Sequence, residues 1–436
     1  MLIQRAMLLD GGTADIRVEE WIVAVAERLV PSRGEQIYDA AGGAVIPGLH
    51  DHHVHLRSAA AALSSVRVGP AEVHSRDDLA RALSTAQVGG DGWIRAVGYH
   101  EAVAGPLDRA VLDDVSPQAP VRVQHRSGVL WTLNSAGLAC VGLADHPDGR
   151  LRSADRSWSD TLQRNETGLA DVSRRLSAYG VTGVTDATPD LEVGDIVKLI
   201  EAHRHGELRQ RVHCLAPGKR ILHDADLDLD ELTAWITARH ADDAPVAVHC
   251  VTAAQLVITL SALRAAGAHP RDRIEHAAVV PDDSIAEIAD LGVTVVTQPN
   301  FVGERGDQYL VDVAASEHHE LWRVASLRAA SVPVALSTDM PFGEDDPWKA
   351  MRCAVGRTTG AGAILGADER VSAREALTMF LGAPDLPVTA RRIEPGQPGD
   401  LCILAAPPAE VLSELDASTV AATVIAGELV FDRSVG

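Results

Sequence analysis

The feature that most constrains this chain is a repeated pattern in which a short apolar run ends in polar residues and a helical segment follows. Buried parallel strands are nearly continuous apolar runs, and strands that alternate with helices indicate βαβ units in a parallel sheet. Apolar residues at helical spacing occur, for example, over 230–241 and 282–291. The apolar runs are 44–47, 183–185, 211–215, 246–248, 273–275, 293–296 and 334–337. The pattern predicts an α/β fold.

Polar residues stand at the C-terminal ends of these predicted strands. In a (β/α)8 barrel this rim is where the active site is built. Without the segment 57–170, in which strand patterns are weak, the region 47–391 has a length close to the ~250 residues typical of such barrels. We therefore predict a TIM-like (β/α)8 barrel over 47–391, with 57–170 inserted after its first strand.

Both ends of the chain carry β-type runs of their own. Strands at both termini that flank a barrel favour a small separate unit built from the two ends. We predict a composite β-sandwich formed by residues 1–46 and 392–436. The runs that support it are 15–18, 21–25, 400–404 and 421–430.

Charge and hydropathy exclude several classes of protein. The net charge of -22 disfavours binding to phosphate backbones and to anionic membrane surfaces. The apolar stretch 21–30 is too short to span a bilayer and contains Glu27 and Arg28, and no signal-peptide pattern follows Met1. We expect a soluble, cytoplasmic protein that binds neither nucleic acid nor membranes.

The cysteines limit the kind of metal site that the chain can build. The five cysteines are far apart and never form a Cys-x-x-Cys pair, which argues against a disulfide framework and against a thiolate zinc site. Ligands for a metal would therefore come from histidines and carboxylates.

Histidines and an aspartate at the predicted rim point to such a site. His53 and His55 are two residues apart on one strand, so both imidazoles face the same side. Alone, such a pair is also typical of surface or structural histidines. His249, His276 and Asp339, however, each end a later predicted strand. Imidazole and carboxylate together suit a borderline cation such as zinc, so the pattern predicts metal binding.

Several motifs together resemble the metal-dependent amidohydrolase superfamily. They are Pro47-Gly48-Leu49, Asp51, His53-Val54-His55, Val248-His249, Ile274-Glu275-His276 and Ser337-Thr338-Asp339. More narrowly, the chain is similar to the branch that contains N-substituted formamide deformylases, amidohydrolase family 3. The matches to that branch are Gly92-Trp93-Ile94, Trp131 to Ala136, Gln298-Pro299, Ser337 to Pro341, Asp346-Pro347-Trp348 and residues 395–401. The resemblance covers nearly the whole chain.

The resemblance implies a metal centre with one or two divalent ions, most commonly Zn²⁺. His53, His55 and Asp339 would hold the first ion, and His249 and His276 the second. In binuclear members a carboxylated lysine bridges the two ions, and Lys219 matches it here. Lysine is scarce in this chain, and the three lysines are Lys198, Lys219 and Lys349.

One departure from the family pattern keeps a mononuclear site open. Only the residues 215–218 separate Cys214 from Lys219, whereas a parallel crossover normally needs about a dozen residues or more. Either the third helix is missing, or residues 211–222 form one bent strand region. Both alternatives put the bridging role of Lys219 in question.

The resemblance implies hydrolysis of a C–N bond in an amide, N-formyl or cyclic amide substrate. A metal-activated hydroxide would attack the carbonyl, and Asp339 would act as the general base and then as the general acid. Metal-bound histidines need acceptors on their other ring nitrogen. The candidates for this role are Asp51, Glu275 and Asp186.

Substrate contacts are expected from the inserted segment and from the rim of the barrel. Tyr99, His100, Glu101, His125 and Trp131 lie in the inserted segment, which in relatives packs over the barrel mouth; Gln298, Asn300 and Met340 end strands on the rim. The expected partner is a small-molecule substrate, and a homodimer is the default oligomer.

Two other functions stay open at this point. A deaminase of heterocycles on the same fold typically has a His-x-x-Glu arrangement, and neither His249 nor His276 has a glutamate three residues later. A non-catalytic relative kept for assembly usually loses ligands, whereas every expected histidine and aspartate is present here.

Overall fold

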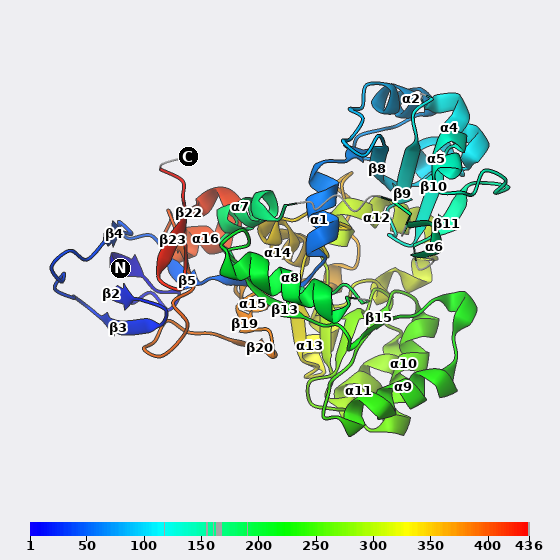
Figure 1. Ribbon diagram of the computed structural model, residues 1–436. Helices are drawn as coiled ribbons and strands as arrows, with labels where there is room; N and C mark the ends of the chain where they lie inside the picture. Colours follow the sequence, from blue (N-terminus) through cyan, green and yellow to red (C-terminus); the bar gives the residue numbers. More distant parts are fainter. Residues whose placement is uncertain (117, 154–155, 160, 163–167, 190, 435–436) are drawn as a thin grey trace. The chain divides into compact units, whose positions relative to one another are not determined.

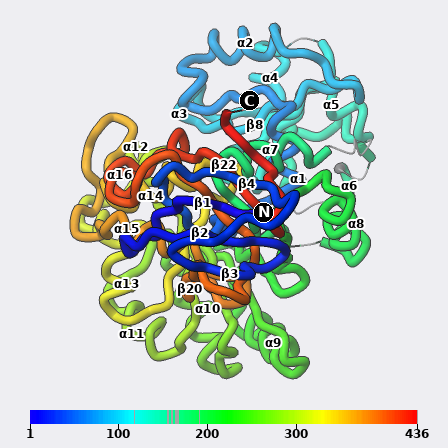
Figure 2. The backbone as a smooth tube through the Cα atoms, turned by 90° about the vertical axis from the view of Figure 1, so that its left-hand side faces the viewer, coloured from blue at the N-terminus to red at the C-terminus, as the bar shows by residue number. Residues whose placement is uncertain are grey.

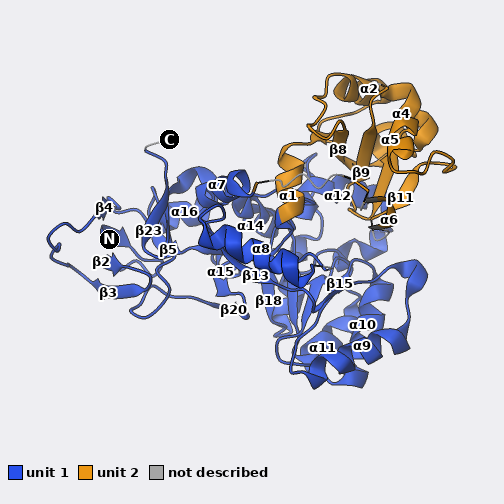
Figure 3. Cartoon of the chain, in the orientation of Figure 1, with its two compact units in different colours: residues 1–56, 169–436 blue, residues 57–168 orange. Residues whose placement is uncertain are grey.

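The computed structural model describes residues 1–116, 118–153, 156–159, 161–162, 168–189 and 191–434. The chain divides into two compact units (Figure 3). Unit 1 comprises residues 1–56 and 169–436, and unit 2 comprises residues 57–168. Among the described residues, no helix has both the length and the apolar character needed to cross a membrane.

The centre of unit 1 is TIM-barrel-like, with parallel strands in two sheets (Figure 1). The three-stranded sheet has the order β13-β12-β6, and the five-stranded sheet has the order β14-β15-β16-β17-β18. Val54 of β6 forms an isolated parallel bridge with Met340, which lies in the segment after β18. The strands are β6 (Leu49–Val54), β12 (Val181–Asp186), β13 (Arg211–Cys214), β14 (Lys219–Ile221), β15 (Ala247–Cys250), β16 (Arg273–His276), β17 (Thr294–Thr297) and β18 (Val334–Leu336).

The strands of this barrel-like core are buried on both faces. Every residue of β6, β12, β16 and β17 is buried. The apolar residues of β12 and β17 fit buried parallel strands, whereas β6 and β16 bury the polar residues of the site. Helices alternate with the strands along the chain. The first of them after unit 2 is α7 (Ala170–Ala178), which precedes β12. The others are α8 (Val193–Arg204), α9 (Leu229–Ala241), α10 (Ala253–Ala266), α11 (Asp282–Leu291), α12 (Asn300–Asp312), α13 (Ala325–Ala329), α14 (Pro347–Gly356) and α15 (Ala373–Thr378).

The connection between β13 and β14 breaks this alternation. Residues 215–218 join the two strands without a helix, and the Gly218 N–H donates to the Leu215 carbonyl at 2.7 Å across the turn. β13 pairs with β12, while β14 pairs with β15 and sets Lys219 beside Ala247. Of the two alternatives that the sequence left open, the structure therefore shows the missing helix.

The two ends of the chain form two further four-stranded sheets (Figure 2). The sheet β3-β2-β1-β4 comes from the N-terminus, and the sheet β23-β22-β21-β5 adds β5 to strands of the C-terminus. Ile16 from the first sheet and Ile403 from the second belong to one buried hydrophobic cluster. The elements are β1 (Leu2–Met7), β2 (Thr13–Val18), β3 (Ile22–Ala26), β4 (Ile37–Asp39), β5 (Val45–Pro47), β21 (Leu401–Leu404), β22 (Val420–Ile425), β23 (Glu428–Asp432), with α16 (Pro408–Glu414) and the hairpin β19 (Gly382–Ala383) and β20 (Leu386–Ala390) nearby in sequence.

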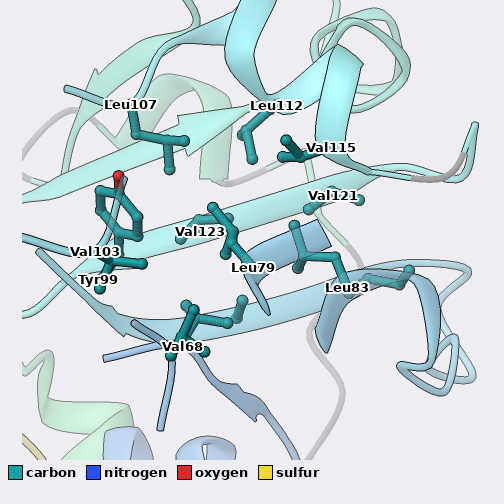
Figure 4. Packing of buried hydrophobic residues seen from close by; sticks show 13 residues of the cluster. Val68, Leu79, Leu83, Tyr99, Val103, Leu107, Leu112, Val115, Val121 and Val123 are labelled. Carbon is teal, nitrogen blue, oxygen red and sulfur yellow. The ribbon is translucent and has the colours of Figure 1, made fainter. Parts of the chain in front are cut away.

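Unit 2 has a five-stranded sheet of its own, in the order β11-β10-β9-β8-β7. Tyr99, Leu79 and Val123 belong to one of its buried clusters (Figure 4). Trp93 and Trp131 belong to another. The elements are β7 (Val66–Arg67), β8 (Ile94–Tyr99), β9 (Val121–His125), β10 (Leu130–Leu133), β11 (Arg150–Arg152), α2 (Arg76–Ser84), α3 (Glu101–Ala104), α4 (Arg109–Val115), α5 (Ser135–Cys140) and α6 (Arg156–Ser159), and α1 (Leu56–Leu63) begins at the last residue before the unit.

Arg357 offers a test of how unit 1 is held together. Its fully buried guanidinium donates to the carbonyls of Leu321, Trp322 and Leu365 at 2.8–2.9 Å. We expect Arg357→Met to lower the free energy of unfolding by about 3 kcal/mol, since each lost bond contributes ~1 kcal/mol. Urea unfolding measures this loss, and the exposed ion-pair variant Arg264→Met should stay within ~0.5 kcal/mol of the wild type. Equal effects of the two substitutions would contradict the assignment.

Candidate metal centre

Three ligand groups gather where β6 and β18 end. Among the described residues, His53, His55 and Asp339 are buried and offer ligand atoms within 4.8 Å of one another. Oδ1 of Asp339 lies 3.6 Å from Nε2 of His53 and 3.4 Å from Nε2 of His55. That oxygen is buried and has no hydrogen-bond donor in the part of the chain that the structure describes. A buried carboxylate oxygen without a donor is costly, and a divalent cation between it and the two imidazoles would satisfy it.

The backbone around Asp339 is fixed by hydrogen bonds to β6. The Asp339 N–H donates to the His53 carbonyl at 3.0 Å, and Asp339 has φ +57°, in the left-handed region. Asp51 accepts from the N–H of Thr338 at 3.1 Å and from its hydroxyl at 2.5 Å. Burial raises the pKa of Asp51 to about 7. The role of Asp51 is thus to hold the residue before Asp339.

His249 and His276 come from the ends of the neighbouring strands β15 and β16. Their ring centroids are 4.5 Å apart, and the His276 ring lies 4.7 Å from that of His53. Burial lowers the pKa of His249 to about 3 and holds the pKa values of His53 and His276 well below the usual range. These imidazoles are therefore neutral, which is the form that binds metals.

Lys219 reaches the same group from the start of β14. Its Nζ lies 3.0 Å from Nε2 of His53, and its side chain is buried. Burial lowers the pKa of Lys219 to about 8, so about a tenth of it is an uncharged amine at pH 7. The missing helix before β14 does not remove Lys219 from the cluster.

Of the three predicted acceptors, Glu275 is the one that contacts an imidazole of the cluster directly. Its carboxylate accepts from Nδ1 of His53, and both side chains are fully buried. Asp186 instead accepts from the N–H groups of Leu56 at 2.9 Å and Thr188 at 3.0 Å. Thr188 in turn places its hydroxyl 3.3 Å from Nδ1 of His55.

The three rim residues predicted to contact substrate have polar partners inside unit 1. Oε1 of Gln298 lies 2.8 Å from Nδ1 of His276. Asn300 donates to the Thr338 carbonyl at 3.0 Å, and the N–H of Met340 donates to the Thr338 hydroxyl at 3.2 Å. Their contact with substrate stays a prediction.

The predicted substrate residues of unit 2 fall into two groups. Tyr99 and Trp131 are buried in its hydrophobic clusters, and the Tyr99 hydroxyl donates to the Gly105 carbonyl at 2.6 Å. His100, Glu101 and His125 form a second set of ligand atoms within 4.8 Å. In that set, Nε2 of His125 lies 3.1 Å from the Glu101 carboxylate. Substrate binding by these five residues also stays a prediction.

One buried residue beside the cluster escaped the sequence analysis. Arg273 is buried, with Nε 2.7 Å from Oε1 of Glu275 and Nη2 donating to the His52 carbonyl at 2.7 Å. The signal was the spacing: Arg273 and Glu275 are two residues apart on β16, so they share a face.

Comparison with known proteins decides the family. Residues 36–431 match the amidohydrolase family. The chain belongs to the amidohydrolase family. As predicted, it is an enzyme that acts on carbon–nitrogen bonds, within a family of metal-dependent hydrolases.

Individual relatives of this amidohydrolase span nearly its whole length. An N-substituted formamide deformylase from Arthrobacter pascens is 24% identical, with 99% of this chain and 95% of that protein covered. An uncharacterized metal-dependent hydrolase from Pyrococcus horikoshii OT3 has a similar fold, with a TM-score of 0.73, 18% identity and coverage of 94% and 98%. The N-isopropylammelide isopropylaminohydrolase from Burkholderia multivorans gives a TM-score of 0.53, 15% identity and coverage of 99% and 98%.

Metal removal tests the cluster of His53, His55 and Asp339. We expect a chelator to lower the melting temperature of the protein, and Zn²⁺ to restore it, because an ion bound only to the folded state stabilises that state. His55→Ala should lose most of this metal-dependent shift, as followed by differential scanning fluorimetry. The control His205→Ala, in an exposed position after α8, should keep it. A full shift in His55→Ala would remove His55 from the ligand set.

Proposed function

We propose that this amidohydrolase cleaves the C–N bond of an N-formyl amine or a related amide or cyclic amide. The observation that carries the proposal is the unpartnered, buried Oδ1 of Asp339, which lies 3.4–3.6 Å from two imidazoles. A carboxylate that is both a ligand and a free acceptor can take a proton at the reacting centre. The name of the Arthrobacter relative supports the N-formyl class.

The donor set favours Zn²⁺, because neutral imidazole and carboxylate suit this borderline cation. When bound, such an ion supplies a water of lowered pKa and polarises the scissile carbonyl. The Asp339 carboxylate would accept the proton of the attacking water and then deliver it to the leaving nitrogen. The backbone bond from Asp339 to His53 would keep the carboxylate in place through both transfers.

Carboxylation of Lys219 is the finer part of the proposal. Its uncharged Nζ would attack the carbon of CO2, so that an N–C bond forms as one C=O π bond breaks onto its oxygen. The nitrogen then loses one proton to solvent water, which leaves a carbamate anion. The lowered pKa of Lys219, about 8, supplies the amine form that this step needs. The carbamate would place a carboxylate between the His53 side and the His249 side of the cluster, where it would bridge two ions.

Asp339→Asn tests the role of the carboxylate. The amide can still lie in the same place but does not accept the proton, so we expect kcat to fall by about 10²- to 10⁴-fold. Steady-state hydrolysis of N-benzylformamide measures the loss. Asp385→Asn, in an exposed position of the β19–β20 hairpin, should leave kcat unchanged. Retained activity in Asp339→Asn would exclude Asp339 as the base.

Carboxylation of Lys219 is tested with ¹³C-labelled bicarbonate. We expect a carbamate signal in the ¹³C NMR spectrum of the wild type that is lost in Lys219→Ala and kept in Lys198→Ala, whose side chain is exposed on α8. A short carboxylic acid such as propionate should restore part of the activity of Lys219→Ala. If the labelled wild type gives no such signal, Lys219 is not carboxylated and the bridge is ruled out.

A further inference from the structure

His53 and His276 have hydrogen-bond partners of different charge. Both imidazoles are buried, and a side chain faces Nδ1 of each. For His53 that partner is the carboxylate of Glu275, and for His276 it is the neutral amide of Gln298 at 2.8 Å. The two partners lie on adjacent parts of the fold, β16 and the end of β17, but they differ by a full charge.

The surrounding bonds fix which ring nitrogen carries the proton. Nε2 of Gln298 donates to the Ser337 hydroxyl at 2.8 Å, so its Oε1 faces His276 and accepts from Nδ1–H. Glu275 as a carboxylate only accepts, so Nδ1 of His53 carries the proton. Each imidazole therefore presents the lone pair of Nε2 to the cluster, which is the tautomer that a metal ligand needs.

Arg273 holds Glu275 in its place. The guanidinium lies against Glu275, with Nε 2.7 Å from Oε1, and is tied to β6 through the His52 carbonyl. The path of β16 also contributes: on an ideal strand Glu275 and His276 would face opposite sides, but His276 has φ +71°. Both residues consequently reach His53, one through a hydrogen bond and the other through its ring.

A carboxylate acceptor makes an imidazole a better metal ligand than an amide acceptor does, because it stabilises the positive charge that the ring acquires. We propose that Glu275, positioned by Arg273, makes the metal position of His53, His55 and Asp339 the tighter of two, and that Gln298 leaves the position of His249 and His276 the weaker. This inference rests on the proposed binding of two ions. It assigns Glu275 and Arg273 as positioning residues and gives Gln298 a part in setting metal affinity.

Metal content measured without any assay of activity tests the inference. Purified protein is equilibrated with Zn²⁺ in buffers of increasing chelator strength. The zinc content per chain is then measured by inductively coupled plasma mass spectrometry. For the wild type we expect two steps, in which one ion leaves at a much lower chelator strength than the other. Glu275→Gln should raise the dissociation constant of the tighter step by about 10- to 100-fold.

Matched variants separate positioning from general damage. Gln298→Glu should tighten the weaker step, which a merely destabilising change would not do. Arg273→Lys should keep most of the tight binding, while Arg273→Met should weaken it. Glu287→Gln, on α11 and paired with Arg264 at the surface, should change neither step. The melting temperature of the metal-free form of each variant reports any loss of fold.

The outcomes are distinguishable. If Glu275→Gln leaves Arg273 unpaired and the protein does not fold, the double variant Glu275→Gln/Arg273→Met removes both buried charges, and the same 10- to 100-fold loss is expected for it. The inference is overturned, and the proposed function is not, if the wild type binds zinc and three variants bind it equally well. These variants are Glu275→Gln, the double variant and Gln298→Glu. A wild type that binds no zinc would overturn the proposed function, and this inference with it.

Discussion

The hydrogen bond from the Asp339 N–H to the His53 carbonyl is the contact on which the site depends. It joins β6 to the segment after β18, which lies far away in the sequence, and Val54 and Met340 form a parallel bridge between the same two segments. Because the same two residues also face each other through Oδ1 and Nε2, the backbone bond fixes the geometry of the side chains. Together with the bonds from Thr338 to Asp51, this contact places Asp339 beside the histidines of β6.

Burial determines the chemistry that this contact makes available. Exposed histidines would be partly protonated near neutral pH and would repel a cation. Here burial lowers the pKa values of His53, His249 and His276 and also lowers that of Lys219 to about 8. Neutral imidazoles lie beside a carboxylate oxygen that has no hydrogen-bond partner among the described residues. This combination is what a divalent cation would need in the proposed site.

The sequence was informative where the position of a residue depends only on the strand that carries it. Apolar runs that end in polar residues predicted the strands now seen as β12, β15, β16 and β17, together with His249 and His276 at their ends. The amidohydrolase family and the enzyme class were also predictable. The sequence was ambiguous over 211–222, because a strand pattern does not say whether the chain between two strands crosses over through a helix.

Contacts between strands were outside the reach of the sequence. The burial of Arg273 was not predicted, since arginine is rarely buried without a partner. Its burial follows from Glu275 on the same face and from the His52 carbonyl on β6, and only the second of these partners is distant in the sequence. Gln298 shows the same limit, because its place at a strand end predicted a polar rim residue but not that His276 would be its partner.

The backbone conformation of two residues in the site was also beyond prediction from the sequence. His276 and Asp339 adopt left-handed backbone conformations that residues other than glycine seldom adopt. At His276 the turn brings adjacent residues of β16 to the same histidine, whereas strand periodicity alone would have assigned them to opposite faces. Such conformations persist only where the surroundings fix them. The ladder of β16 with β15 and β17, and the bond from Asp339 to β6, provide that support.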